Sequence, residues 1–382
     1  ARGWRISLIE RAAVPGDGAS GNRAGVLRPL PSLDDNRLAR LTRAAFEHAL
    51  AHLQALSTAG LPLRWRQSGV LHLARDERHA ATQQRVVAEQ SPAAGFLRWV
   101  GPETASELAG WPVAAGGWWF PGGGWVDPAS LCRANLARHS AAVRPHYRRQ
   151  VERIAYQEGC WRSFDAAGEM IAAAPVLVLA NAGDARRFAA ASHLPLRTAR
   201  GQVSHLPATT GTAPDIVVCR LGYVTPAIDG LRCAGATFAV DDDEPGLRAA
   251  DHAENLARLE FILPGYSRHI DAGQLGGRVG FRPLSPDRLP IIGAVADAAT
   301  IDAGGPAATL AGLRRAGDPL PQPLAAGAGR LTLVGAEGSG RLSALSPGSV
   351  VYVDAELASE AHDLGGARLS GVTEAEEPMR VQ

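Results

Sequence analysis

Residues 4–10 read Trp-Arg-Ile-Ser-Leu-Ile-Glu, a short apolar strand that ends on an acidic residue. In a dinucleotide-binding sheet, the second parallel strand ends on such a group, which accepts hydrogen bonds from the adenosine ribose. Glu10 is therefore a candidate ribose ligand. A second reading, in which Glu10 is an exposed glutamate at the end of an ordinary strand, stays open from this stretch alone.

The residues beside this strand predict its neighbours in such a sheet. A glycine-rich loop follows at 16–25, and glycine lets a backbone approach a ligand closely. Before the strand, Ala1-Arg2-Gly3 resembles the glycine-terminated end of a helix. A first strand and its G-x-G-x-x-G turn belong further upstream and are missing here. We expect either a further N-terminal region or a truncated gene product.

The rest of the sequence alternates helical and strand patterns. Apolar spacing predicts a helix over 34–57 capped by Ser32 or Asp34, and Asp127-Pro128 is typical of a helix start. A continuous apolar run at 175–180 is typical of a parallel strand. Further expected elements are strands at 69–74, 147–155, 160–164 and 331–334, helices at 102–109 and 247–263, short antiparallel strands over 200–238, and a surface excursion at 297–329.

The composition is that of a globular protein with balanced charge. The 382 residues are 46% hydrophobic, and their net charge of +1 excludes a strongly basic coating for nucleic acid, though not a local patch. The chain has no lysine, so its 39 Lys-plus-Arg residues are all arginine. Its 4 cysteines form no C-x-x-C pair, which predicts neither a zinc site nor disulfides. Because no apolar run is long enough to span a bilayer, we expect a soluble protein with no membrane partner. The spacing of the cysteines fits a reducing cytoplasm and predicts no metal site.

Several strings, in order along residues 4–293, resemble one group of flavoenzymes. They are Gly-Ala-Ser-Gly-Asn-Arg-Ala-Gly at 18–25, Gly-Gly-Trp-Val-Asp-Pro at 123–128, Val-Leu-Ala-Asn-Ala-Gly at 178–183, Arg-Gly-Gln-Val-Ser-His-Leu-Pro at 200–207, Gly-Tyr-Val-Thr-Pro at 222–226 and Arg-Pro-Leu-Ser-Pro-Asp-Arg-Leu-Pro-Ile-Ile-Gly at 282–293. Together they resemble the FAD-dependent amine oxidoreductases of the glycine oxidase and sarcosine oxidase type. Within that group, the first and fourth strings resemble the oxidoreductase domain of the MnmC family of bifunctional tRNA-modification proteins.

This resemblance implies FAD as the cofactor and tRNA as the substrate. In that family, a carboxymethylaminomethyl group on the wobble uridine is oxidised at the methylene beside its carboxylate. Hydrolysis of the resulting imine leaves an aminomethyl group and glyoxylate. A methyltransferase domain, usually N-terminal in the same chain and not part of this sequence, then methylates the amine. Two alternatives stay open: a flavin oxidase of a free small amine of the glycine or sarcosine type, and a truncated, non-catalytic remnant.

The resemblance also implies an α/β fold. A FAD-binding, Rossmann-like parallel sheet without its first strand carries an inserted, mainly antiparallel α+β substrate domain. On this pattern, residues 1–60, 121–200 and 278–345 form the FAD-binding domain, and residues 61–120 and 201–277 form the substrate domain. Residues 346–382 are an unassigned tail.

The same resemblance places the cofactor-binding residues. Glu10 would hold the ribose, with Arg11 near the adenine and the backbone of Val151 in contact with it. The loop residues that would approach the pyrophosphate and flavin are Ser20, Asn22, Arg23 and Gly25. Ala180 and Gly183 would line the turn beneath the phosphates, and the strand end beside the flavin ring would be formed by Pro290, Ile291 and Gly293.

Arg282 is the first candidate catalytic residue. Orienting a carboxylate calls for a planar, permanently charged donor, and the resemblance places Arg282 at that position. Its alternative is a surface arginine in a turn. Tyr223 either lines the substrate side of the flavin or is a core tyrosine. His205 is either a polar pocket residue or a strand histidine with a satisfied hydrogen bond.

Clustered arginines, with Tyr147 among them, are the candidates for tRNA contact. A solvated arginine face is the default interpretation of such spacing, so RNA binding is implied by the resemblance and not by charge. The residues are Arg144, Arg148, Arg149, Arg186, Arg187, Arg197 and Arg200.

Overall fold

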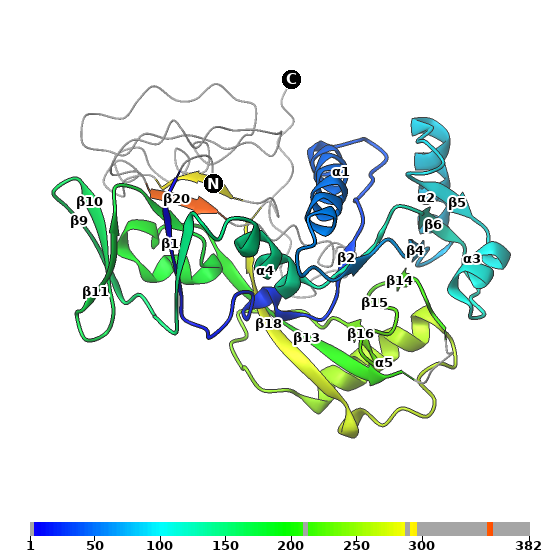
Figure 1. The fold of residues 1–382 in the computed structure, drawn as a ribbon. Coiled ribbons are helices and arrows are strands. Elements are labelled where there is room, and N and C mark those ends of the chain that lie inside the picture. Colours follow the sequence, from blue (N-terminus) through cyan, green and yellow to red (C-terminus); the bar gives the residue numbers. More distant parts are fainter. Residues whose placement is uncertain (1–3, 209–212, 287–290, 296–349, 354–382) are drawn as a thin grey trace, which may run out of the picture.

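A computed structural model describes residues 4–208, 213–286, 291–295 and 350–353 of the chain. It confirms the predicted α/β class, with parallel strand pairs in one region and a large mixed sheet in another (Figure 1). The strand expected at 331–334 and the excursion at 297–329 lie outside the described residues. Among the described residues, no helix is long and apolar enough to cross a membrane.

The large sheet holds nine strands within the described residues, most of them antiparallel to their neighbours. Its order is β17 (Ala239–Val240), β13 (Arg197–Pro207), β16 (Leu231–Gly235), β15 (Tyr223–Val224), β14 (Val217–Cys219), β4 (Val70–Leu73), β6 (Gly117–Phe120) and β5 (Arg98–Val100), and β18 (Gly276–Leu284) also pairs with β13. The short antiparallel strands predicted over 200–238 are thus confirmed.

Each face of this sheet is covered by a different set of elements. Helices α3 (Pro102–Ala109) and α5 (Ala249–Ile262) pack on one face, where Leu71 and Leu259 are buried. Helix α2 (Glu77–Gln90) and strand β2 (Gly25–Leu27) pack on the other face around Trp118. The helix predicted at 102–109 has those bounds, and the one predicted at 247–263 is α5.

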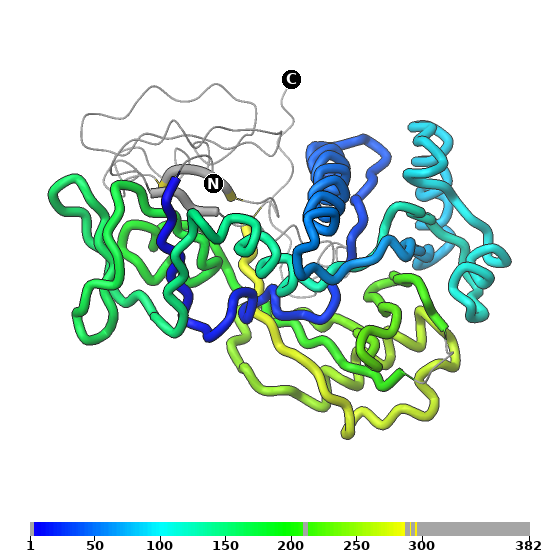
Figure 2. Tube along the Cα trace, in the orientation of Figure 1, coloured from blue at the N-terminus to red at the C-terminus, as the bar shows by residue number. Residues whose placement is uncertain are grey.

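Two parallel strand pairs lie apart from the large sheet. Strand β1 (Ile6–Glu10) pairs with β8 (Val143–Tyr147), as the tube in Figure 2 shows for these sequence-distant segments. Strand β12 (Leu177–Leu179) pairs in parallel with β20 (Val350–Val353), which β19 (Ile292–Ala294) joins in an antiparallel sense. A meander of β9 (Arg153–Gln157), β10 (Cys160–Phe164) and β11 (Met170–Ala174) lies beside them, followed by the short helices η2 (Ala182–Arg187) and η3 (Ala189–Ala191).

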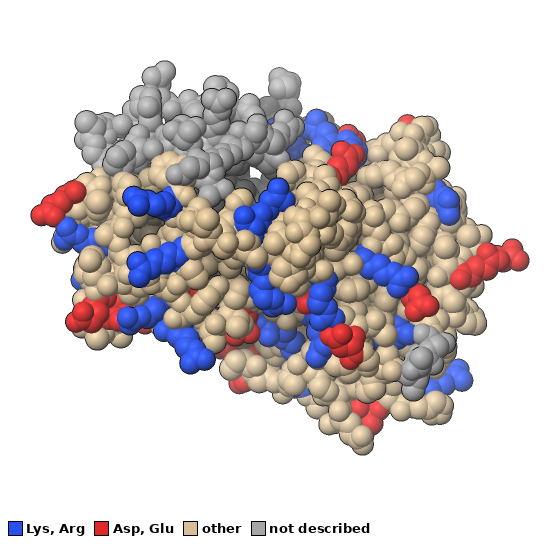
Figure 3. Space-filling model, in the orientation of Figure 1, with Lys and Arg blue, Asp and Glu red and all other residues tan. Residues whose placement is uncertain are grey.

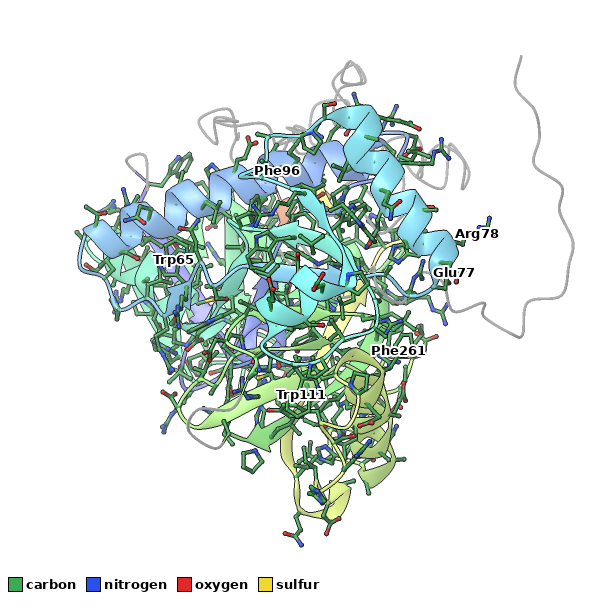
Figure 4. The ribbon with its side chains drawn as sticks, turned by 90° about the vertical axis from the view of Figure 1, so that its right-hand side faces the viewer. Trp65, Glu77, Arg78, Phe96, Trp111 and Phe261 are labelled. Atoms are coloured by element: carbon green, nitrogen blue, oxygen red, sulfur yellow. The ribbon has the colours of Figure 1, made fainter. Side chains whose placement is uncertain are left out.

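A small antiparallel sheet connects these regions. It has the order β2, β7 (Gly124–Val126) and β3 (Trp65–Arg66). The helices α1 (Arg37–Thr58) and α4 (Pro128–Arg138) flank it, and Figure 4 shows Phe96 beside α1, where its ring meets Phe46 edge-on at 6.0 Å.

Two helix caps test the predicted helix starts. Asp127 caps α4 as expected, accepting from the Ser130 N–H at 2.9 Å. The cap predicted for α1 was wrong, because Asn36 accepts the Ala39 N–H at 3.1 Å. Ser32 instead accepts the N–H of Asn36, and Asp34 accepts from the Asn36 side chain, so both support the cap from outside the helix.

Candidate functional site

The glycine-rich loop at 16–25 is held on two sides. Gly16 has φ +77°, and a Cβ there would lie 2.9 Å from the Ala129 Cα of α4, so only glycine fits this approach. On the other side, Arg278 Nη2 donates to the carbonyl oxygens of Asp17 and Gly18 at 2.5 Å each. A Cβ on Gly18, by contrast, would meet nothing within 4 Å. The loop is thus held by α4 and β18, and its backbone is open on the side that a Cβ of Gly18 would occupy.

The predicted loop residues lie in the second half of this loop and in the strand after it. Ser20 is in the one-turn helix η1 (Ala19–Gly21), and Asn22 follows it. The Arg23 guanidinium lies 3.7 Å from Asp229, whose carboxylate also pairs with Arg64 at 2.7 Å. Gly25 begins β2 and pairs with Val126.

The ends of two parallel strands meet close to each other. Glu10 ends β1, and its Oε1 accepts the N–H of Ala12 at 2.8 Å. The next residue, Arg11, forms an ion pair of 2.6 Å with Asp184 in η2, which follows β12. Carboxyl ends of parallel strands at one edge are where open α/β sheets bind ligands, so Glu10 lies in a suitable place for one.

The other predicted cofactor residues divide into two groups. Ala180 and Gly183 lie in the turn after β12, where a Cβ on Gly183 would be 3.2 Å from the Thr198 hydroxyl. Val151 and Ile291 pack against the hydrophobic cluster around Leu179. Gly293 lies in β19 and pairs with Tyr352, and Pro290 lies outside the described residues.

These features fit a dinucleotide cofactor. The half-buried carboxylate of Glu10 supplies acceptors for ribose hydroxyls, and the open backbone at Gly18 admits close contact. No group of three or more His, Cys, Asp or Glu side chains that could hold a metal ion occurs in the described part of the chain.

Strand register brings the two predicted catalytic residues onto one face of the large sheet. Arg282 pairs with Ala199 of β13, and Val203 and His205 follow on the same face at two-residue steps. His205 pairs with Cys233, and Tyr223 pairs with Gly235, two residues further along β16. Arg282 and Tyr223 therefore share the face that packs against β2 and the glycine-rich loop.

Tyr223 and Arg282 differ in their surroundings on that face. Tyr223 is 3% exposed and belongs to the hydrophobic cluster that contains Ala24 and Val26. Arg282 is half-buried, and its guanidinium forms no hydrogen bond or ion pair with any residue that the structure describes. A partly desolvated cation without a partner is costly, and cations of this kind are typical of ligand sites.

Arg200 was predicted to contact tRNA, but the structure buries it away from the surface. It is 1% exposed and lies on the opposite face of β13, where it pairs with Asp251 of α5. It also donates to the carbonyl oxygens of Glu244 at 2.7 Å and Gly246 at 2.6 Å. The prediction was wrong because alternate residues of a strand face opposite ways, and the even-numbered residues of β13 face α5.

The other arginines in that group differ in how they are paired. Arg144 and Arg148 are exposed and form no ion pair with described residues. Three pair with acids, namely Arg149 with Asp165, Arg187 with Glu152 and Arg197 with Asp241, while Arg186 donates to the Leu196 carbonyl. Tyr147, half-buried in β8, pairs with Glu10. Figure 3 shows basic side chains over the left half and centre of one face, interspersed with acidic ones.

His205 lies between charges on the loop side of the sheet. Burial first, and then the charges of Arg23, Arg278 and His252, lower the pKa of His205 below 6.5. Its Nε2 is buried and has no hydrogen-bond partner among the described residues. The satisfied strand histidine is therefore not what the structure shows, and His205 presents an unused polar atom on the face of Arg282.

Sequence reasoning missed Arg278. Arg278, Gly280 and Arg282 alternate along β18, so they share one face. That alternation is visible in the sequence, but the loop that Arg278 contacts lies at the other end of the chain. The spacing of the arginines could have identified their shared strand face, but nothing in the sequence indicates that Arg278 contacts the loop at 16–25.

Comparisons with known proteins bear on this arrangement. Residues 1–344 match the family described as FAD dependent oxidoreductase. The chain is 57% identical over 295 residues to the "tRNA 5-methylaminomethyl-2-thiouridine biosynthesis bifunctional protein MnmC" of Aromatoleum aromaticum, covering 77% of this chain and 46% of that protein. The protein of the same name from an Azoarcus species is 52% identical, with 79% and 48% covered. The chain thus spans about half the length of these relatives.

Solved structures share the fold. The glycine oxidase of Geobacillus kaustophilus superposes with a TM-score of 0.62 at 23% identity, covering 76% of this chain and 79% of that one. The iminodiacetate oxidase of a Chelativorans species gives 0.61 at 23% identity, covering 76% and 80%. At this level of identity the likeness establishes the architecture alone, and it is the architecture expected from the sequence strings.

Proposed function

The chain belongs to the family of FAD-dependent oxidoreductases, and from that premise we propose that it oxidises a carboxymethylaminomethyl group on the wobble uridine of tRNA. The group is a secondary amine that carries a carboxylate. Oxidation at the methylene beside the carboxylate gives an imine, and water splits that imine into glyoxylate and the aminomethyl-uridine. The names of the similar MnmC proteins support the tRNA substrate, and their bifunctional character supports a methyltransferase acting afterwards.

The guanidinium of Arg282, which has no partner in the part of the chain that the structure describes, is the observation that carries this proposal. It is half-buried, lacks a partner among the described residues, and shares a sheet face with Tyr223 and His205. Arginine binds a carboxylate through two parallel N–H donors, which fixes both the position and the rotation of the substrate. In our proposal, Arg282 holds the carboxylate so that the adjacent methylene is oriented for oxidation.

The other residues on this face lie at different distances from Arg282. Oxidation needs the amine in its neutral form, but His205 lies six residues along β13 from Ala199, the partner of Arg282, so it is about 20 Å away along the strand and beyond a substrate held by Arg282. The buried ring of Tyr223 excludes water from the same face. FAD, when bound, supplies the acceptor for the two electrons and hydrogen that leave the methylene.

We assign the cofactor residues as the sequence predicted them. Glu10 would bind the ribose, and the loop residues Ser20, Asn22, Arg23 and Gly25 would lie along the pyrophosphate and flavin. This assignment is supported by the position of Glu10 at a parallel strand end and by the open backbone at Gly18. The division into a FAD-binding and a substrate domain at 1–60, 121–200 and 278–345 against 61–120 and 201–277 belongs to the same proposal.

The test compares substrates and arginine variants. Purified chain with added FAD is incubated with tRNA that carries the carboxymethylaminomethyl group, and glyoxylate is measured. Arg282→Met and Arg282→Lys should both lose activity by about a hundredfold, because a lost charge-assisted pair costs about 1.5–3 kcal/mol and geometry is lost as well. Arg78, labelled in Figure 4 at the exposed start of α2, provides the control variant Arg78→Met.

Two results would contradict the proposal. Full activity of Arg282→Met would show that Arg282 does not bind the substrate carboxylate. Glyoxylate from free glycine or sarcosine, with none from the modified tRNA, would instead identify a small-amine oxidase.

A further inference from the structure

Arg278 fills a space that exists only because residue 21 is glycine. A Cβ built on Gly21 would overlap the Nη2 and Cζ atoms of Arg278, and it would also come within 2.7 Å of Nε. Gly21 does not have a positive φ, so its backbone does not require glycine for conformational reasons. The missing side chain at position 21 therefore serves to admit the guanidinium of Arg278.

The contacts of Arg278 are with backbone and not with acids. Its Nη2 donates to the carbonyl oxygens of Asp17 and Gly18 at 2.5 Å each, and no described acidic side chain pairs with it. Hydrogen bonds from a charged donor are roughly twice as strong as neutral ones. The two bonds join residues 261 and 260 positions apart in the sequence, so they connect the loop to a strand that is distant along the chain.

That strand also carries the proposed substrate clamp. Arg278 and Arg282 lie four residues apart on the same face of β18, which places their Cα atoms about 13 Å apart along the strand. Between them, a Cβ on Gly280 would lie 3.7 Å from the Ala19 Cα, so the strand approaches the loop at a second point. The loop at 16–25 and Arg282 are thus both positioned by the same strand, β18.

We propose that Arg278 is a positioning residue that locks the loop at 16–25 against β18. The lock holds the cofactor-binding loop and the carboxylate-binding Arg282 in a fixed position relative to each other. This inference rests on the proposed role of the loop as the cofactor cradle. The lock holds the loop in its binding shape before any ligand arrives. Loss of the lock therefore weakens FAD binding, because ordering of the loop then has to accompany binding.

Two readouts test the lock on the whole 382-residue chain without measuring turnover. Hydrogen exchange of peptides covering residues 16–25 is followed in the cofactor-free protein, and the dissociation constant of FAD is measured by flavin fluorescence. The variants are Arg278→Met, Arg278→Lys, Gly21→Ala and the double variant Gly21→Ala with Arg278→Met. Gly276→Ala, at the exposed start of β18, is the matched control for exchange, since a Cβ there meets nothing within 4 Å.

Gly21→Ala should reproduce Arg278→Met, because the added methyl expels the guanidinium. Both should speed exchange of the loop and weaken FAD binding at least about tenfold. The double variant should be no worse than either single variant, and Arg278→Lys should recover part of the affinity. A thermal melt checks that every variant is folded.

Unchanged loop exchange in Arg278→Met or Gly21→Ala overturns the lock, and so do additive effects in the double variant. Faster exchange with unchanged FAD affinity overturns the link between the lock and the cofactor. Neither readout depends on the tRNA reaction, so failure of the proposed function is detected separately, by the absence of glyoxylate.

Discussion

Arginine is the only long cationic side chain in this protein. The role of each arginine depends on the groups that it contacts. Arg200, Arg278 and Arg282 lie on the paired strands β13 and β18. Arg200 is buried and fully bonded, Arg278 donates to loop carbonyls, and Arg282 has no partner among the described residues. One residue type thus serves the core, the loop anchor and the proposed substrate clamp within one strand pair.

This contrast predicts that the same substitution affects the free energy of unfolding strongly at Arg200 and little at Arg282. Arg200→Met leaves the Asp251 carboxylate partly buried and unpaired, and it should lower the free energy of unfolding by about 3–5 kcal/mol. Arg282→Met breaks no described contact and should change the free energy of unfolding by less than about 0.5 kcal/mol. Urea unfolding of both variants checks this, and equal losses would show that Arg282 has a structural role.

Two histidines make stability depend on pH. Burial is the leading cause that lowers the pKa of both His205 and His252, so each folded-state pKa lies below the unfolded value of 6.5. The unfolded chain then binds more protons as the pH falls below 6.5, and the folded state loses stability there. This contribution is fully present above that pH.

The melting temperature of the wild type should therefore fall between pH 7 and pH 5.5 more steeply than that of His205→Asn. The exposed His269 gives the control variant His269→Asn, which should follow the wild-type curve. Identical slopes for wild type and His205→Asn would show that His205 does not contribute to this linkage.

At the scale of elements, close strand packing depends on particular glycines. Gly124 in β7 lies between β2 and β3, and a Cβ there would overlap the backbone oxygen of Arg66. Because backbone cannot move as a side chain can, Gly124→Ala should destabilise the protein by about 1–3 kcal/mol or more. Gly95→Ala, which meets nothing within 4 Å, should stay within about 0.5 kcal/mol of the wild type in the same unfolding experiment. A small effect at Gly124 would contradict the packing of β7.

Elements with local signals were predicted well from the sequence. Pro102 in the first position predicts the helix at 102–109. Asp127 and Pro128 predict the start of α4 in the same way. The α1 cap was misplaced because Ser32, Asp34 and Asn36 are all competent caps, and only the chain path before the helix selects among them. Local chemistry thus fixes the type of an element better than its boundary.

Site features that depend on register could not be predicted in the same way. The burial of Arg200 follows from the packing of β13 on α5, and the anchoring role of Arg278 follows from the meeting of β18 with the loop at 16–25. Both contacts join distant parts of the chain. Recognisable strings identified the candidate Arg282, but only the sheet pairing shows that it shares a face with Tyr223.

At the scale of the whole molecule, parallel strand ends and one face of a large sheet meet at the glycine-rich loop. Glu10 marks the strand end, and Arg282 marks the sheet face. The strand β20 comes from the region without a sequence resemblance and pairs with β12 in parallel. Segments from both ends of the described chain therefore build the region around the proposed cofactor site.

A tRNA substrate predicts salt-dependent binding through the exposed arginines beside β1 and β8. Affinity falls as salt rises, so the slope of log affinity against log salt is negative. Arg144→Gln and Arg148→Gln should each make this slope shallower by about 0.7–1, because each removes one proposed phosphate contact. Arg197→Gln should change the slope less, since Asp241 already neutralises that cation. Filter binding of tRNA across a salt series measures these slopes, and equal effects of all three variants would place the RNA elsewhere.

The absorbance of bound flavin under anaerobic conditions reports whether a substrate delivers electrons to the cofactor. The chain is first saturated with FAD, and each amine is then added in turn. We expect tRNA carrying the carboxymethylaminomethyl group to bleach the flavin absorbance, and we expect tRNA without that group, glycine and sarcosine to leave it unchanged. The Arg282→Met variant should retain the flavin and bleach far more slowly. Bleaching by a free amine alone, or a chain that holds no flavin, would show that this protein does not oxidise the modified uridine of tRNA.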